Sequence, residues 1–503
     1  MERVKSFCKT KVFIYFLLAL FCLLLACLSK DYDYDLFARL IVGEKFVEAG
    51  QIAYEDFLSY TPTHLWYDHE WGSGVVFYLM LKHFGAFGLT LIHATTMFFT
   101  VFFVIKTQEL QKHTYPLCLS FVILFTLLFS HLNPSIVRCH MFSFMFFAMF
   151  LYFLEKTRKT GSNIIWLVAP ITIIWNNLHG GIVSGLGMIF IYMVGELISR
   201  RPWKKLFLVL FVSTPLLVIN PYGVDYLNFL FSANTKDREY ITEWWSVFAN
   251  RHVIYYYPAF VFGVCGLAAS FERILSKRKI DITHTIALIT TVTLGILHVK
   301  LLSIAVIVIA ALYSNTILRL FEKGSLKNLN KLAYVIVVMA ILYLPFTKPV
   351  FSKVDFKKFP VKECEFLKIN NIKGNLLTTF GLGSYTSYKL YPQNLIYMDG
   401  RYEEVYNDIE FERLINFEKA ADTWYEALTE YPTQILMPEK TNLGFEHMKK
   451  QKEWQLVYEG ECAGVFVPKP WAKKEYKMPS DDINYYKSTA FENFGEFGKN
   501  GEY

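Results

Sequence analysis

Residues 31–71 read DYDYDLFARLIVGEKFVEAGQIAYEDFLSYTPTHLWYDHEW. This stretch follows the first long apolar run, Val12–Leu28, and it is dense in carboxylates and aromatic side chains. Many further apolar segments follow it along the chain. A long polar first loop with several acids, followed by many apolar segments, predicts a polytopic membrane protein that carries out chemistry at the outer face of the bilayer.

The composition is that of a membrane protein. The chain has 503 residues, of which 53% are hydrophobic, and its mean hydropathy is +0.29. The apolar residues fall into blocks of about 16–21, the length that a helix needs to cross the hydrocarbon core. The 46 Phe and 32 Tyr residues suit lipid-facing helices and interfacial belts. The net charge of +7 comes largely from short loops between the apolar blocks, so it does not indicate a nucleic-acid partner.

The apolar blocks predict about 11–12 transmembrane helices. After the first span they cover 86–105, 115–132, 136–154, 163–179, 181–198, 204–220, 255–271, 282–298, 300–319 and 332–348. The basic leader at residues 1–11 predicts a cytoplasmic N-terminus, although Leu24–Cys27 also resembles a lipoprotein cleavage box. Five basic loops then fall on the cytoplasmic side: 106–113, 155–159, 200–205, 272–279 and 319–331. Because Trp71–Phe84 is too short for a comfortable span, we expect an interfacial or partly inserted helix there.

The character of the sequence changes after residue 348. We expect a transmembrane domain over 1–348, including the first outer loop 31–71, an extracytoplasmic α/β domain over 349–475 and a polar tail over 476–503. In the second domain short apolar runs alternate with helical patterns. The expected strands are 376–380, 395–398, 434–437 and 454–458, and the expected helices are 364–369, 409–417, 423–429 and 445–451. The expected fold class is an all-α polytopic membrane domain followed by a small α/β domain. Cys364 and Cys462 either form a disulfide there or remain buried thiols.

The first outer loop holds the candidate catalytic acids. Asp35 opens an amphipathic helix that we expect to lie along the bilayer surface. Asp35, or alternatively Asp33, would deprotonate an acceptor or hold a divalent metal. A purely structural interpretation makes Asp35 an N-cap and Asp33 a solvated loop charge. His69 and Glu70 lie nearby between two Trp residues and offer a base, an acid and a metal ligand, although an ordinary interfacial belt explains them equally well.

Polar side chains also gather at the span ends that this topology puts outside. The candidates for substrate binding are Arg138, His140, Asn177, His179, Glu243 and Lys300. Cations at this interface could bind the phosphate of a lipid-linked substrate. The alternative for each residue alone is anchoring to lipid headgroups. Because no Cys/His metal spacing occurs, a divalent ion at the first-loop carboxylates is the one cofactor that the sequence leaves open.

Several motifs together resemble a widespread group of bacterial multispan proteins. They are Asp33-Tyr34-Asp35-Leu36-Phe37, Asp56-Phe57-Leu58-Ser59-Tyr60-Thr61, His69-Glu70-Trp71, Arg138-Cys139-His140, Asn177-Leu178-His179-Gly180-Gly181, Asn220-Pro221-Tyr222-Gly223, Glu243-Trp244, Gly383-Ser384-Tyr385 and Met398-Asp399-Gly400-Arg401. The group resembles the C-type glycosyltransferase (GT-C) superfamily, which includes protein mannosyltransferases, oligosaccharyltransferases and the lipid A aminoarabinose transferase. Two runs depart from the group's pattern. Phe37-Ala38-Arg39 replaces an aromatic-aromatic-His run, and Lys300-Leu301-Leu302 replaces an Arg before an Asn.

The resemblance implies a multi-pass glycosyltransferase in the inner (cytoplasmic) membrane of a bacterium. Its donor would be a polyprenyl-phosphate-linked sugar, and its acceptor an envelope protein, lipid or polysaccharide on the outer face. The resemblance also implies an acidic base in the first outer loop, a role that falls on Asp35 before Asp33. Two other functions fit the residues: a transporter or flippase of lipid-linked sugars, and a non-catalytic envelope assembly protein.

Overall fold

The computed structural model describes residues 2–28, 32–111, 136–235, 238, 241–249, 253–275, 280–320, 354–482 and 485–486. The chain divides into two compact units. Unit 1 comprises Met1–Ser29 and Thr90–Val350, and unit 2 comprises Lys30–Leu89 and Phe351–Tyr503. Unit 2 therefore joins the first predicted loop, 31–71, to the C-terminal third of the chain, whereas the sequence analysis grouped that loop with the transmembrane segments.

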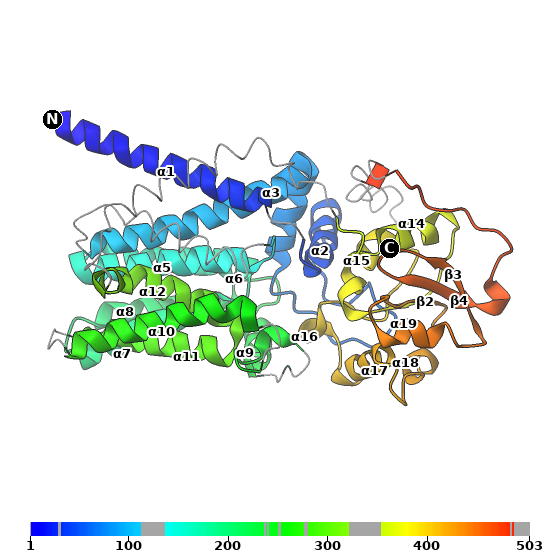
Figure 1. Cartoon of the computed structure of the whole chain (residues 1–503). Coiled ribbons are helices and arrows are strands. Elements are labelled where there is room, and N and C mark those ends of the chain that lie inside the picture. Colours follow the sequence, from blue (N-terminus) through cyan, green and yellow to red (C-terminus); the bar gives the residue numbers. More distant parts are fainter. Residues whose placement is uncertain are drawn as a thin grey trace. The chain divides into compact units, whose positions relative to one another are not determined.

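Unit 1 is built from helices (Figure 1). They are α1 (Glu2–Leu28), the second part of α3 (Trp71–Leu110), α5 (His140–Thr160), α6 (Val168–Leu178), α7 (Ile182–Ile198), α8 (Lys204–Ser213), α9 (Asp225–Thr235), α10 (Val253–Leu275), α11 (Ile282–Leu297) and α12 (Leu302–Leu320). Short 3₁₀ turns lie at η1 (Asn163–Leu167), η2 (Thr214–Val218), η3 (Thr242–Trp244) and η4 (Val299–Leu301). Helix α12 packs against α5, α10 and α11, and residues 306–311 within it are fully buried. An apolar helix buried on all sides marks the centre of a bundle.

The predicted spans correspond to helices wherever they fall on described residues. Spans 136–154, 163–179, 181–198, 204–220, 255–271, 282–298 and 300–319 match α5, η1–α6, α7, α8–η2, α10, α11 and η4–α12. Spans 115–132 and 332–348 lie outside the described residues. Among the described helices, α3 alone has both the length and the apolar composition to cross a bilayer, with a mean hydropathy of 1.9. The other apolar segments of the described chain have 10–17 residues.

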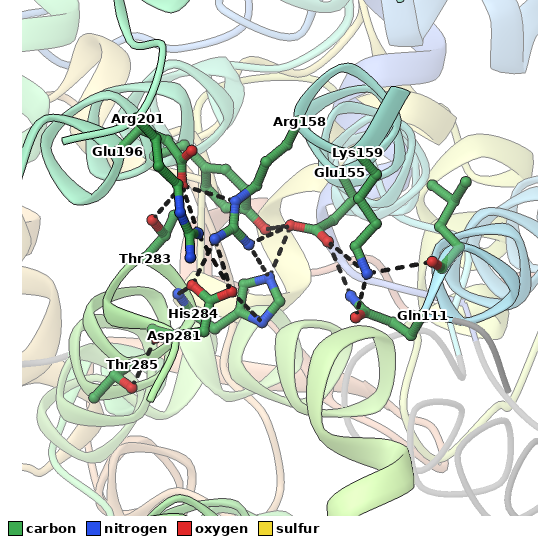
Figure 2. A network of polar contacts seen from close by, with 12 residues as sticks. Gln111, Glu155, Arg158, Lys159, Glu196, Arg201, Asp281, Thr283, His284 and Thr285 are labelled. Atoms are coloured by element: carbon green, nitrogen blue, oxygen red, sulfur yellow. Dashed lines mark hydrogen bonds and ion pairs between the residues drawn. The ribbon is translucent and has the colours of Figure 1, made fainter. Parts of the chain in front are cut away.

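One end of unit 1 is held by a network of polar contacts (Figure 2). Arg158, near the end of α5, donates to Glu196 at the end of α7 and to Asp281 just before α11, each at 2.7 Å. Glu155 of α5 accepts from Gln111, which follows α3, at 2.9 Å. These positions lie in or beside four of the five loops that the sequence analysis assigned to the cytoplasmic side.

The opposite ends of the same helices meet separately. Trp175 of α6 donates to Ser143 near the start of α5 at 2.7 Å. The backbone N–H of Val247, after η3, donates to the carbonyl of Ile296 at the end of α11 at 2.9 Å. The two groups of predicted loops therefore lie at opposite ends of unit 1. Which end faces the cytoplasm stays a prediction.

Helix α3 changes direction at Gly85, whose φ of 59° and ψ of −157° interrupt the helix. Only glycine adopts such a backbone conformation without strain. The segment Trp71–Phe84 is thus a helix of its own, and the predicted span 86–105 begins just after the interruption. Its position at the membrane interface stays a prediction.

Unit 2 contains a four-stranded sheet in the order β1-β2-β4-β3. The strands are β1 (Leu376–Thr378), β2 (Ile435–Met437), β3 (Trp454–Glu459) and β4 (Gly464–Pro468). Strands β1 and β2 are parallel, whereas β4 is antiparallel to both β2 and β3. The helices are α2 (Asp35–Ala49), the first part of α3, α14 (Val361–Ile369), α15 (Phe380–Leu390), α16 (Tyr402–Val405), α17 (Asp408–Glu418), α18 (Glu426–Thr429) and α19 (Leu443–Met448). In Figure 1, α14 and α19 lie on opposite sides of the strands.

The predicted α/β alternation is confirmed in unit 2, with some differences. The strand expected at 395–398 makes only isolated bridges through Ile396, to Leu376 of β1 and to Ser59. Strand β4 and helix α15 were not expected. Cys364 and Cys462 are buried free thiols and do not form a disulfide, which agrees with the second of the two alternatives.

The first loop forms part of unit 2. Backbone hydrogen bonds join Leu58 and Tyr60 to Ile396, and His64 to Val405, at 2.8–3.1 Å. Helix α2 begins at Asp35 as expected, and its position at a bilayer surface stays a prediction. Residues 36–44 are all buried, and α2 packs against α15. Two charged side chains of α2, Arg39 and Glu44, are among these buried residues, and Arg39 contacts three carboxylates.

Candidate functional site

The Asp35 carboxylate lies against a turn of the C-terminal part of unit 2. Asp35 is the first residue of α2, and its half-buried side chain contacts Gly400 so closely that a Cβ at position 400 would overlap its Oδ1 atom. The Oγ of Ser384 on α15 lies 3.5 Å from that same Cβ position. The carboxylate of Asp33 accepts the backbone N–H of Asp35 at 2.9 Å. Asp33 therefore fixes the start of α2, while Asp35 directs its carboxylate toward Gly400.

A buried ionic cluster surrounds Arg39, one turn further along α2. The guanidinium contacts Asp68 at 2.5 Å, Glu70 at 2.8 Å and Glu404 at 2.5 Å. His69 lies 3.3 Å from Glu404 and 3.7 Å from Glu70. The three carboxylates thus face one arginine and one histidine in a setting with little solvent, where ionic interactions are strong.

This setting shifts the protonation of the cluster. Burial alone would lower the pKa of His69, but the carboxylates of Glu404 and Glu70 outweigh burial and raise it to about 9. Burial likewise opposes the charged form of Glu404, yet Arg39 and His69 hold the pKa of Glu404 well below its usual range. At neutral pH His69 is therefore a cation that neutralises carboxylates, and it is not a free base. The catalytic role of His69 stays a prediction.

A second buried cluster lies around Arg401, next to the turn at Gly400. Arg401 contacts Asp399 at 2.8 Å and Asp56 at 2.6 Å, and all three side chains are essentially inaccessible to solvent. Burial opposes ionisation of Asp56, but the charge of Arg401 outweighs burial and lowers the pKa of Asp56. Trp66 joins the two clusters, because its Nε1–H donates to Glu404 at 2.7 Å and its ring lies 4.5 Å from the Arg401 guanidinium.

Arg39 and Arg401 occupy several of the first-loop carboxylates at which a metal was predicted. Asp56, Asp68 and Glu70 each have a guanidinium within 2.8 Å. A divalent ion would compete with Arg39 or Arg401 for these oxygens. Asp33 already accepts a backbone N–H. A metal at these carboxylates stays a prediction.

In unit 1 the structure brings three of the predicted binding residues together. Arg138 contacts Glu243 at 2.6 Å, and Lys300 lies 5.0 Å from the ring of Trp244. Burial opposes the charge of Glu243, but Arg138 and Lys300 outweigh burial and lower its pKa. Arg238, which the sequence analysis did not single out, also stacks on Trp244, with its guanidinium carbon 4.1 Å from the ring. Two cations, Arg238 and Lys300, therefore lie over Trp244, and Arg138 pairs with the neighbouring Glu243.

Two further predicted residues form a histidine pair. The rings of His140 and His179 lie 4.5 Å apart between centroids. Nδ1 of His179 accepts the backbone N–H of Gly181 at 2.9 Å and lies 2.7 Å from the hydroxyl of Ser143. A backbone N–H can only donate, so His179 carries its proton on Nε2 in the neutral form. Asn177 instead ties chain segments together, because its amide donates to the carbonyls of Ile173 and Ile219 at 2.8 Å.

The predicted site residues therefore fall into two sets. Asp33, Asp35, His69 and Glu70 belong to unit 2, and Arg138, His140, Asn177, His179, Glu243 and Lys300 belong to unit 1. The meeting of both sets in one pocket stays a prediction. Sequence reasoning missed Arg39, Ser384, Arg401 and Glu404 as partners, although Gly383-Ser384-Tyr385 and Met398-Asp399-Gly400-Arg401 had been noted as motifs without a role.

Solved structures of one membrane protein resemble this chain over most of its length. The crystal structure of ArnT from Cupriavidus metallidurans in the apo state covers 92% of this chain and 98% of its own, with a TM-score of 0.52 and 11% sequence identity. The structure of the same ArnT bound to undecaprenyl phosphate covers 91% and 98%, with the same TM-score and identity. No protein-family model matches the sequence, and no significant match to a curated protein is found. ArnT is the lipid A aminoarabinose transferase, a GT-C protein, so the resemblance inferred from the motifs is confirmed for the fold. The chain has a fold similar to that of ArnT.

Proposed function

We propose that this protein is a multi-pass membrane glycosyltransferase that transfers a sugar from a polyprenyl-phosphate-linked donor to an envelope acceptor. The observation that carries the proposal is the ArnT-like fold over 92% of the chain, together with undecaprenyl phosphate bound to ArnT in one of its structures. The proposal includes a bacterial inner membrane location, a cytoplasmic N-terminus and chemistry on the outer face.

The chemistry requires one base and a few cations. Asp35 takes the proton of the acceptor hydroxyl or amide as that group attacks the anomeric carbon of the sugar. The bond between this carbon and the phosphate oxygen breaks, and the polyprenyl phosphate leaves with the electron pair. Arg138, Arg238 and Lys300 would bind the phosphate and stabilise its growing negative charge. The placement of Arg238 and Lys300 over Trp244, with Arg138 beside the adjacent Glu243, supports this role.

Replacement of Asp35 by Asn tests the base. An amide cannot accept the proton, so Asp35→Asn should lower transfer by about 100-fold or more while leaving the fold intact. The measurement is mass spectrometry of envelope glycans in cells that carry the wild-type or variant gene, with protein levels compared by immunoblot. Asp33→Asn tests the alternative base in the same way, because Asn keeps an oxygen that accepts the backbone N–H of Asp35, and it should retain transfer if Asp35 is the base. Full activity of Asp35→Asn would exclude Asp35 as the base.

The same comparison separates the competing functions. A transporter of lipid-linked sugars or a non-catalytic assembly protein needs no proton acceptor at position 35, and either would tolerate Asp35→Asn. Orientation is tested by fusing alkaline phosphatase after residue 482, where an active fusion would support an extracytoplasmic C-terminal domain. A cytoplasmic reporter active at that position would contradict the proposed topology.

A further inference from the structure

We propose that the C-terminal α/β region positions the base: the turn at Gly400, braced by Ser384, holds the carboxylate of Asp35 in its working place. This inference rests on the proposed function. It adds the turn at Gly400 to an active site whose catalytic acid is Asp35. Gly400 and Ser384 act here as positioning residues.

The strongest observation is the fit between Gly400 and Asp35. A Cβ built on Gly400 would overlap Oδ1 of Asp35 and would lie 3.1 Å from its Cγ. Gly400 is not among the glycines with positive φ, so its backbone does not itself require glycine. Glycine is needed at position 400 because the Asp35 carboxylate occupies the space that any side chain would take.

The turn that receives Asp35 is held firmly. The Gly400 N–H points to the Ser384 Oγ at 3.4 Å. Arg401 holds Asp399 through its Nε at 2.8 Å and through its backbone N–H at 3.1 Å. A Cβ on Gly383 of α15 would overlap the carbonyl oxygen of Met398, so α15 lies directly against this turn. A rigid surround of this kind is what keeps a catalytic group in a productive geometry.

Asp35 is also fixed from its own side. The Asp33 carboxylate sets the first turn of α2, and Phe37 of α2 packs against Tyr385 of α15 with ring centroids 4.7 Å apart. Helix α2, helix α15 and the turn at Gly400 therefore form one support with the Asp35 carboxylate at its edge. The Asp35 side chain is partly buried and not fully enclosed.

Gly400→Ala is the decisive variant. The atom that the new methyl group meets is the end of a flexible side chain, so the fold should survive while Asp35 is displaced. We expect transfer to fall by about 10- to 100-fold, because displacement of about 1 Å costs a catalytic group that much. The unfolding temperature should stay at the wild-type value.

Two other glycines provide controls. A Cβ on Gly381 would meet Tyr34 no closer than 3.6 Å, which is ordinary contact, so Gly381→Ala should leave transfer unchanged. A Cβ on Gly383 would meet backbone atoms, so Gly383→Ala should lower the unfolding temperature. Loss of transfer without loss of stability in Gly400→Ala alone is the pattern that a positioning role predicts.

The position of Asp35 can be followed without any reaction. The full-length protein in detergent is treated with a water-soluble carbodiimide and glycine ethyl ester, and amidation of Asp35 is quantified by peptide mass spectrometry. Displacement from Gly400 should raise the labelling of Asp35 in Gly400→Ala but not in Gly381→Ala. Binding of undecaprenyl phosphate, measured by native mass spectrometry, should be equal in all three proteins.

These readouts keep the two proposals apart. If the wild-type protein neither binds undecaprenyl phosphate nor transfers sugar, the proposed function fails, while the labelling still reports whether Gly400 positions Asp35. If Gly400→Ala keeps wild-type transfer and wild-type labelling, the positioning role is overturned although the enzyme is active. If transfer falls with unchanged labelling and weaker lipid binding, Gly400 acts on the donor, and the positioning role is again overturned.

Discussion

The guanidinium of Arg39 and the carboxylate of Glu404 lie 2.5 Å apart, although 365 residues separate them in the chain. Both side chains are 3% exposed. Trp66 completes the contact by donating its Nε1–H to the same carboxylate at 2.7 Å. The first loop and the C-terminal region must therefore come together to form unit 2. A small set of buried ion pairs fixes how these two segments pack.

Arg39→Met should destabilise unit 2 strongly. Removal of one partner leaves Glu404 and Asp68 charged and buried, which costs about 3–5 kcal/mol. The unfolding temperature of the protein in detergent, followed by differential scanning fluorimetry, should fall by about 10 °C. The unfolding temperature of Glu404→Gln should fall by a similar amount. The double variant Arg39→Met/Glu404→Gln should lose less stability than the sum of the two single losses, because the two residues interact directly.

Arg413 offers the control for this prediction. Its guanidinium is 19% exposed and contacts Glu410, Glu426 and Glu430 at 3.6–3.9 Å. Arg413→Met should cost only about 0–1 kcal/mol, as exposed ion pairs do. Equal losses in Arg39→Met and Arg413→Met would show that burial of the Arg39 cluster contributes nothing.

His69 predicts a dependence of stability on pH. Its pKa rises from 6.5 to about 9 in the folded protein. Because the folded pKa is the higher one, its contribution is complete below pH 6.5 and is lost as the pH rises through 9. A shift of this size corresponds to about 3 kcal/mol. The unfolding temperature should therefore decrease as the pH is raised from 6.5 to 9.

The variant His69→Gln isolates this effect. Glutamine does not titrate, so the variant should be less stable at pH 6.5 and should show a flatter profile up to pH 9. Burial raises the pKa of Asp68 to about 6. Measurements above pH 6.5 therefore exclude most of the contribution of Asp68 to the pH dependence of stability. Parallel profiles for wild type and His69→Gln would mean that His69 is neutral in the folded protein.

Much of the fold could be predicted from local sequence patterns, whereas the contacts within the candidate site could not. The apolar blocks of about 16–21 residues and the basic loops predict the helices of unit 1 and their grouping at two ends, because both signals are local. Strands β1, β2 and β3 were predicted for the same reason. Helix α15 was missed because its sequence contains two glycines and two serines, which favour other conformations, and its packing against α2 overrides that preference.

Arg39 shows why the site was harder to predict. In the sequence analysis its run, Phe37-Ala38-Arg39, stood out only as a departure from the pattern of the resembling group. Its partners come from residues 68–70 and from residue 404. No periodicity within one segment can indicate a partner more than 300 residues away. The same holds for Asp35, whose contact with Gly400 depends on the packing of α2 against α15.

Gly181→Ala should destabilise unit 1 through a single methyl group. A Cβ there would overlap the Ser143 Oγ and lie 2.6 Å from Nδ1 of His179. These atoms form part of a packed hydrogen-bonded group with Trp175, so the expected cost is about 1–3 kcal/mol. Gly187 lies in the same helix region with nothing within 4 Å of its Cβ position.

Gly187→Ala should therefore stabilise the protein slightly, because alanine favours a helix by about 1 kcal/mol over glycine. The unfolding temperatures of both variants give the test. Opposite signs are expected, and a stabilising Gly181→Ala would mean that the contact between α5 and the start of α7 is loose.

Arg158 is the hub of the network in Figure 2, and its replacement should loosen one end of unit 1. It reaches Glu196 through Nε at 2.7 Å and both oxygens of Asp281 through Nη2 at 2.7 Å, while Nη1 lies 3.5 Å from Glu155. Arg158→Met removes the guanidinium nearest to Glu196 and Asp281, while Arg201 stays 3.6 Å and 3.8 Å from these two carboxylates. We therefore expect a cost of about 3 kcal/mol, at the low end for a buried ion pair that loses one partner. Arg158→Lys keeps the charge but cannot bond three carboxylates at once, since a lysine lacks the planar fork of donors.

The expected order of unfolding temperatures is wild type, then Arg158→Lys, then Arg158→Met. Lys204→Met, at an exposed position at the start of α8, is the matched loss of one positive charge and should change little. A lysine that restores the full wild-type temperature would show that charge alone holds these helix ends. Because the guanidinium bonds residues from α5, α7 and the start of α11 at three different angles, we expect geometry to matter as much as charge.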